Sequence, residues 1–101
     1  MYGSPVGTAN VTSSQQLLST DYKGRVFSIN FMASGTSSTI KLLTNGVSGT
    51  VLIHEQSTES LPKTVDFGIN GYLFDNGIYV QFDAQSSRVT VSYRQEEKNN
   101  P

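Results

Sequence analysis

Hydrophobic residues alternate with polar ones along several separate stretches of this 101-residue sequence. In one of them, Phe27, Ile29 and Phe31 are separated by Ser28 and Asn30. A period of two predicts β-strands that turn one face toward a core. No window of ten residues or more has the three- and four-residue apolar spacing of an amphipathic helix. The sequence therefore predicts an all-β protein.

Turn residues separate these stretches. Asn45-Gly46 and Asp75-Asn76-Gly77 are typical of tight hairpins, because their central residues tolerate positive φ. About eight short strands are expected, at residues 15–19, 25–33, 39–43, 50–55, 63–67, 71–74, 78–83 and 88–94. Strands at this spacing favour an antiparallel, jelly-roll-like β-sandwich, with an eight-stranded barrel as the alternative.

The two ends of the chain have little to bury. Residues 1–12 are expected to form an N-terminal arm, residues 13–94 the sandwich domain and residues 95–101 a polar C-terminal tail. Residues 1–10 lack a basic segment followed by an apolar run, so no signal peptide is expected. We therefore expect the protein to be made in a host cytoplasm.

Composition excludes whole classes of function. The sequence has no Cys and one His, which removes disulfide frameworks, thiol nucleophiles and multi-histidine metal sites. Seven basic residues against eight acidic ones leave no positive field for nucleic acid or an anionic membrane. Fourteen Ser and ten Thr replace much of the usual surface charge. We therefore expect no nucleic-acid partner, no membrane partner and no cofactor.

The residues that could support catalysis form no convincing site. His54 and Glu55 are neighbours on an expected strand, so their side chains point to opposite faces. Asp66, Asp75 and Asp83 are explained by a turn or by the polar faces and ends of strands, and they lack the close spacing of calcium ligands. No serine lies in a Gly-x-Ser-x-Gly elbow. We expect no catalytic residue, no metal site and no enzyme activity.

Apolar residues on the second face of the strands suggest contacts with other proteins. Val26, Met32, Leu43 and Leu52 are the candidates for such an interface. The alternative is that these four residues close a second layer of the same sandwich. Self-association would also cover exposed sheet edges in a domain of this size.

Two segments resemble small β-rich virion proteins of tailed bacteriophages. The first is IKLLTNGVSGTVL at residues 40–52, where a strand, an Asn-Gly turn and Ser-Gly-Thr lead into the next strand. The second combines GIYV at residues 77–80 with SRVTVSY at residues 87–93, which is similar to a closing hairpin in such proteins. The likeness spans residues 24–93 and includes no catalytic motif.

This resemblance implies a capsid decoration, or cement, protein on the exterior of a virion. Such a protein is expected to form a homotrimer, to bind the major capsid protein and to stabilise the shell by adding interface. Tyr2, Pro5 and Val6 in the N-terminal arm are the expected capsid contacts.

Two other virion roles remain open. A carbohydrate- or receptor-binding module of a tail fibre would need exposed rings at Tyr72, Tyr79 or Tyr93. A head–tail neck or tail component would differ from a shell protein in its copy number per particle.

Overall fold

The computed structural model describes residues 7–33, 37–58, 62–82 and 86–98. These residues form nine β-strands, and no helix occurs within the described ranges. The strands are β1 (Gly7–Val11), β2 (Gln15–Leu18), β3 (Tyr22–Ala33), β4 (Ser37–Thr44), β5 (Thr50–Thr58), β6 (Pro62–Asp66), β7 (Tyr72–Phe74), β8 (Ile78–Phe82) and β9 (Ser86–Lys98). The expected all-β class is confirmed.

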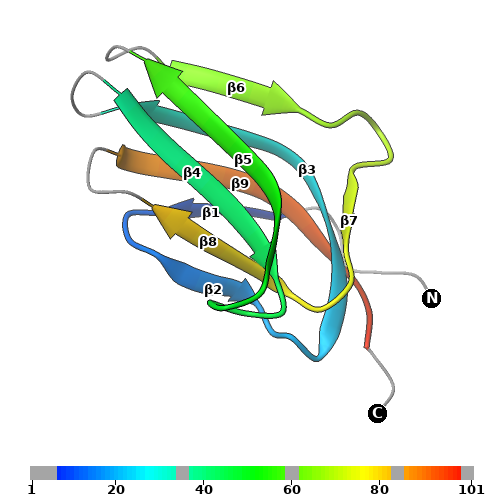
Figure 1. The fold of residues 1–101 in the computed structure, drawn as a ribbon. Helices are drawn as coiled ribbons and strands as arrows, with labels where there is room; N and C mark the ends of the chain where they lie inside the picture. The colour runs from blue at the N-terminus through cyan, green and yellow to red at the C-terminus, as the bar shows by residue number, and fades with distance from the viewer. Residues whose placement is uncertain (1–6, 34–36, 59–61, 83–85, 99–101) are drawn as a thin grey trace.

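The strands form two antiparallel sheets that face each other (Figure 1). One sheet has the order β1-β9-β3-β6, and the other has the order β2-β8-β4-β5. The short strand β7 joins the first sheet by pairing with residues 24–26 of β3, on the N-terminal side of the residues that pair with β6. Successive strands therefore pass repeatedly from one sheet to the other, which is the strand order of a jelly roll. The protein is a jelly-roll sandwich with one short added strand, and the barrel alternative is wrong because the two sheets stay separate.

The polar ends contribute more strand than the sequence suggested. Residues 7–11, expected in the arm, form the edge strand β1, which pairs with β9 from Gly7↔Tyr93 to Val11↔Val89. Residues 95–98, expected in the tail, extend β9 along the start of β3. The sequence did not predict these strand segments because mostly polar strands bury few side chains and show no hydrophobic alternation. In β1 only Val11 is buried.

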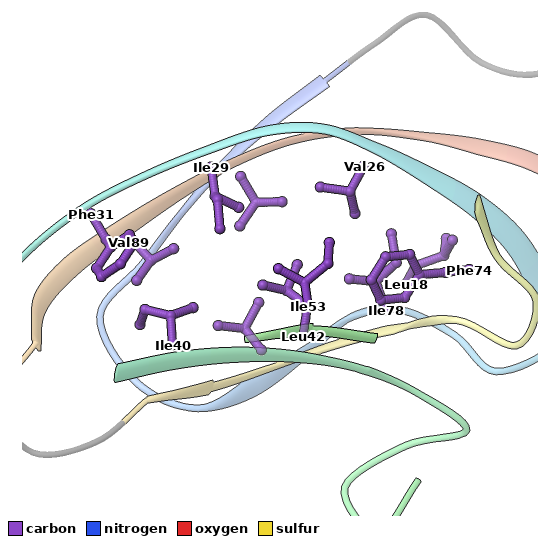
Figure 2. Packing of buried hydrophobic residues seen from close by; sticks show 12 residues of the cluster. Leu18, Val26, Ile29, Phe31, Ile40, Leu42, Ile53, Phe74, Ile78 and Val89 are labelled. Carbon is purple, nitrogen blue, oxygen red and sulfur yellow. The ribbon is translucent and has the colours of Figure 1, made fainter. Parts of the chain in front are cut away.

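The core lies between the two sheets and is almost wholly aliphatic (Figure 2). The expected inward residues Ile29, Phe31, Ile40 and Leu42 are all buried there. The whole cluster comprises Leu18, Val26, Ile29, Phe31, Ile40, Leu42, Ile53, Phe74, Ile78, Val80, Val89 and Val91. Burial of these side chains is the main force that holds the sheets together.

A β-bulge in β3 changes which residues face the core. Val26 pairs with Tyr93 and Ser28 with Ser92, so Phe27 is the extra residue of the strand. The bulge shifts the alternation by one position. Val26 is therefore buried while Phe27, expected in the core, is only half-buried. The sequence could not reveal this shift, because both residues are hydrophobic.

The two expected hairpin turns have different outcomes. Asn45 and Gly46 both have positive φ, at 72° and 83°, and lie in the β4–β5 hairpin as predicted. The Asp75-Asn76-Gly77 turn instead carries the chain from β7 in one sheet to β8 in the other. The expected closing hairpin is also wrong, because β8 and β9 belong to opposite sheets.

Three turns interlock at one end of the sandwich (Figure 1). The Gly77 N–H donates to the Tyr22 carbonyl oxygen at 2.8 Å, and the Asn45 N–H donates to the Asn76 carbonyl oxygen at 2.9 Å. Gly77 has φ of 78°, and a Cβ there would lie 2.5 Å from the Leu18 carbonyl oxygen. This position therefore requires glycine both for its conformation and for its space.

We predict that Gly77→Ala lowers the free energy of unfolding by about 2 to 4 kcal/mol, from left-handed strain and the backbone clash. Gly7→Ala is the matched control, since a Cβ at position 7 would meet nothing within 4 Å apart from its neighbours in the chain. The control is expected to change stability by less than about 0.5 kcal/mol in urea unfolding. Equal effects of the two substitutions would contradict the interlocked turns.

Candidate docking surface

The residues considered for catalysis are dispersed. His54 is exposed on β5 opposite Lys41, whereas Glu55 forms an ion pair with Lys63 of β6 at 3.1 Å. The carboxylate of Asp66 accepts the Gly68 N–H at 2.8 Å, which gives it a structural role. Asp83 lies outside the described residues. Within the described ranges, no group of three His, Asp or Glu residues could hold a metal ion.

A row of alternating Asn and Thr residues crosses the outer face of the five-stranded sheet. The register aligns Asn10, Thr90, Asn30 and Thr64 on β1, β9, β3 and β6. Thr90 Oγ1 donates to Asn10 Oδ1 at 2.7 Å, and Asn30 Nδ2 donates to Thr64 Oγ1 at 2.6 Å. We call these four residues the polar row. It carries no charge, and it contains two cross-strand side-chain hydrogen bonds, one between β1 and β9 and one between β3 and β6.

The sequence-predicted interface residues occupy different places. Val26 is buried between the sheets, so it closes the core and cannot be a docking residue in this fold. Leu43 projects from the outer face of the four-stranded sheet, between Val51 and Tyr79, yet its neighbours leave it only 3% exposed. Leu52 is the bulge residue of β5 and packs partly against the core. The Met32 side chain lies outside the described part of the structure.

The expected contact residues of the arm, Tyr2, Pro5 and Val6, also lie outside the described residues. Of the three tyrosines considered for sugar stacking, only Tyr72 is exposed. Tyr79 is half-buried, and half-buried Tyr93 donates its hydroxyl hydrogen to the Leu17 carbonyl oxygen at 3.3 Å. The three rings therefore form no shared platform.

Exposed large hydrophobic side chains gather in two segments of the described chain. The first segment is the β4–β5 hairpin, with Val47 (65% exposed) and Val51 (43%). The second runs from the loop after β6 into β7, with Ile69 (92%) in the loop and Tyr72 (40%) and Leu73 (39%) in β7. The hydrogen bond from the Asn45 N–H to the Asn76 carbonyl links the turn of the first segment to the turn that follows β7. Tyr72 and Leu73 are neighbours on β7, so their side chains point to opposite faces of that strand. We call the five residues of these two segments together the candidate docking surface.

The more exposed segment is a tight turn at residues 67–71, which we call the Ile69 turn. The Gly71 N–H donates to the Gly68 carbonyl oxygen at 3.2 Å, and both glycines have positive φ. The Phe67 N–H donates to the carbonyl oxygen of the bulge residue Phe27 at 2.9 Å. The Phe67 and Tyr72 rings then meet edge to face, with centroids 6.1 Å apart.

A small charged cluster supports this turn from the neighbouring strands. Glu96 on β9 accepts hydrogen bonds from Arg94 Nε at 2.6 Å and from Arg25 Nε at 3.1 Å. Arg25 also donates through Nη1 to the Asn70 carbonyl oxygen at 3.0 Å. Arg94 lies 5.3 Å from the centroid of the Phe27 ring, within cation–π range. The chain of contacts runs from the end of β9 to the residue beside Ile69.

The two arginines decide the ionisation of Glu96. Partial burial, the largest single influence, raises the pKa of its carboxyl, but the hydrogen bonds and charges of Arg94 and Arg25 together outweigh burial. The pKa of Glu96 is therefore held below its ordinary value of 4.5. Its ion pairs consequently persist at neutral pH and are lost only in acid.

Sequence reasoning missed Ile69. The expected strand at residues 63–67 ends two residues before Ile69, and β6 itself ends at Asp66, so the exposure of Ile69 was not anticipated. Gly68 and the Asn70-Gly71 pair were the available signal for a turn at this point.

The comparisons with known proteins found likenesses among solved structures only. No protein-family model and no curated protein matches the sequence. A coat protein of Tobacco streak virus overlaps 95% of this chain and 88% of its own, at 12% identity and a TM-score of 0.40. A score this low supports no conclusion, so the jelly-roll assignment rests on strand order. No helix in the described residues is long and apolar enough to cross a membrane.

We predict that Glu96→Gln lowers the free energy of unfolding by about 1 kcal/mol at pH 7, because two partly buried ion pairs are weakened. Glu97→Gln is the control, since its contact with Lys23 is 3.8 Å long and Glu97 is exposed. That control should cost no more than a few tenths of a kcal/mol.

The pH dependence has a definite sign. A carboxyl whose pKa is lowered by folding stabilises the protein above its ordinary pKa of 4.5, and the contribution disappears as pH falls through the folded value. The stability difference between wild type and Glu96→Gln should therefore shrink below about pH 4.5 in urea titrations. A difference that stays constant down to about pH 3 would contradict the ion-pair assignment.

Proposed function

We propose that this protein is a non-enzymatic virion structural protein, of the capsid decoration type, that binds the exterior of a shell of major capsid protein. The observation that carries the proposal is the candidate docking surface, where all five exposed large hydrophobic residues of the described chain occupy two linked segments. Exposed large hydrophobic side chains on a small domain are available for contacts with other proteins.

The polar part of the described surface also suits a protein that functions by binding other proteins. The polar row is neutral and contains two side-chain hydrogen bonds between neighbouring strands. Contacts made by apolar burial and neutral hydrogen bonds are screened little by salt. The resemblance of residues 40–52 to phage virion proteins falls on the β4–β5 hairpin, which supplies Val47 and Val51 of the docking surface.

Self-association belongs to the same proposal. We propose a homotrimer, in which strand edges of neighbouring copies are covered, and Tyr2, Pro5 and Val6 as additional capsid contacts. Some edges are already protected within one copy, since Lys63 Nζ donates to the Gln56 carbonyl oxygen of edge strand β5 at 2.8 Å. A lysine at this position discourages further strand pairing along β5.

We predict that purified virus particles contain this protein in many copies, in a fixed ratio to the major capsid protein, and keep it in about 1 M NaCl, where ion pairs are screened. Quantitative mass spectrometry of washed particles measures both quantities. A copy number equal to one ring would identify a neck component. Absence from particles, or complete release at high salt, would contradict the proposal.

A further inference from the structure

The chain contains three Asn-Gly pairs, and each lies between two strands. They are Asn45-Gly46 after β4, Asn70-Gly71 before β7 and Asn76-Gly77 before β8. An asparagine that precedes glycine is chemically labile, because glycine has no side chain to shield its amide nitrogen from the neighbouring carboxamide. The sequence gives all three asparagines this lability, so a difference among them has to come from the fold.

The reaction that such asparagines undergo is deamidation. The glycine nitrogen loses its proton to solvent base and attacks the asparagine Cγ, a C–N bond forms, and the side-chain nitrogen leaves as ammonia. Water then opens the resulting cyclic succinimide at either carbonyl, which gives aspartate or isoaspartate. Water is consumed, ammonia is released and no oxidant is needed. Ring closure requires the peptide plane between the two residues to rotate about the asparagine Cα–C bond.

The Asn76-Gly77 peptide plane is held at both ends by the backbone. Its carbonyl oxygen accepts the Asn45 N–H at 2.9 Å, and its N–H donates to the Tyr22 carbonyl oxygen at 2.8 Å. Gly77 is also buried, and a Cβ there would lie 2.5 Å from the Leu18 carbonyl oxygen. Ring closure at Asn76 therefore has to break two hydrogen bonds within the interlocked turns.

The Asn70-Gly71 peptide plane is held by one side chain and one backbone group. Its carbonyl oxygen accepts a hydrogen bond from Arg25 Nη1 at 3.0 Å, and its N–H donates to the Gly68 carbonyl oxygen at 3.2 Å. Asn70 is exposed, so solvent reaches it freely. Its protection comes from the two hydrogen bonds that rotation of the plane breaks.

The Asn45-Gly46 peptide plane differs from the other two. Within the described residues, neither its carbonyl oxygen nor its N–H has a hydrogen-bond partner. Asn45 is exposed, and its φ of 72° is a left-handed conformation that residues other than glycine adopt at a cost. Rotation of this plane therefore breaks no hydrogen bond of its own, and leaving the left-handed conformation costs Asn45 little.

We propose that Asn45 is the site of spontaneous deamidation in the folded protein, with water as the co-reactant, and that Asn70 and Asn76 are protected. The reaction does not depend on the function proposed above, but its product alters the candidate docking surface. It places a negative charge two residues from Val47. Isoaspartate also lengthens the main chain by one carbon atom beside the N–H that bonds to the Asn76 carbonyl.

The test compares each asparagine with itself in folded and urea-unfolded protein. Full-length protein is incubated in mildly alkaline buffer with and without urea, and peptide mass spectrometry after digestion at acidic pH follows each site over time. In urea all three sites should react readily, because the turns are lost. In the folded protein Asn45 should react within about 3-fold of its unfolded rate, whereas Asn70 and Asn76 should be slower by about 10-fold or more, since two hydrogen bonds must open first.

The matched variant is Asn45→Gln, because glutamine has to form a larger ring and reacts slowly. Isoelectric focusing of folded wild-type protein should show acidic species that accumulate with time and that are mostly lost in this variant. Equal protection of Asn45 and Asn70 would overturn the assignment, as would reaction of all three sites at their unfolded rates. Acidic species that accumulate equally in Asn45→Gln would overturn it as well.

Discussion

The bulge at Phe27 in β3 is the constraint on which the rest of this structure depends. β3 is the central strand of its sheet and pairs with β9, β6 and β7. The bulge turns Val26 into the core and Phe27 out of it, and leaves the Phe27 carbonyl to accept the Phe67 N–H. The same residue thus sets the register of the core and supports the turn that carries Ile69.

The sequence predicted the approximate positions of eight of the nine strands in the described residues, because the alternation of Ile29 and Phe31, or of Val89 and Val91, reports which face is buried. It could not predict bulges, because neighbouring residues such as Val26 and Phe27 are both hydrophobic and either one could face the core. It also missed the crossings between sheets at Gly77 and between β8 and β9, because strand partners are chosen by packing far along the chain.

The candidate docking surface was largely invisible in the sequence for a related reason. Val26 was a candidate interface residue and is buried, whereas Ile69 was given no role and is almost fully exposed. For Val26 the expectation followed an unbroken alternation, which the bulge at Phe27 interrupts.

Docking of this sandwich on a capsid shell is tested most directly by a reconstruction of the virus particle at a resolution that traces β-strands. We expect many copies of the sandwich on the outside of the shell, with residues of the candidate docking surface against a capsid subunit. A reconstruction in which the sandwich is absent from the shell, or in which no residue of the candidate docking surface contacts a capsid subunit, would contradict this arrangement.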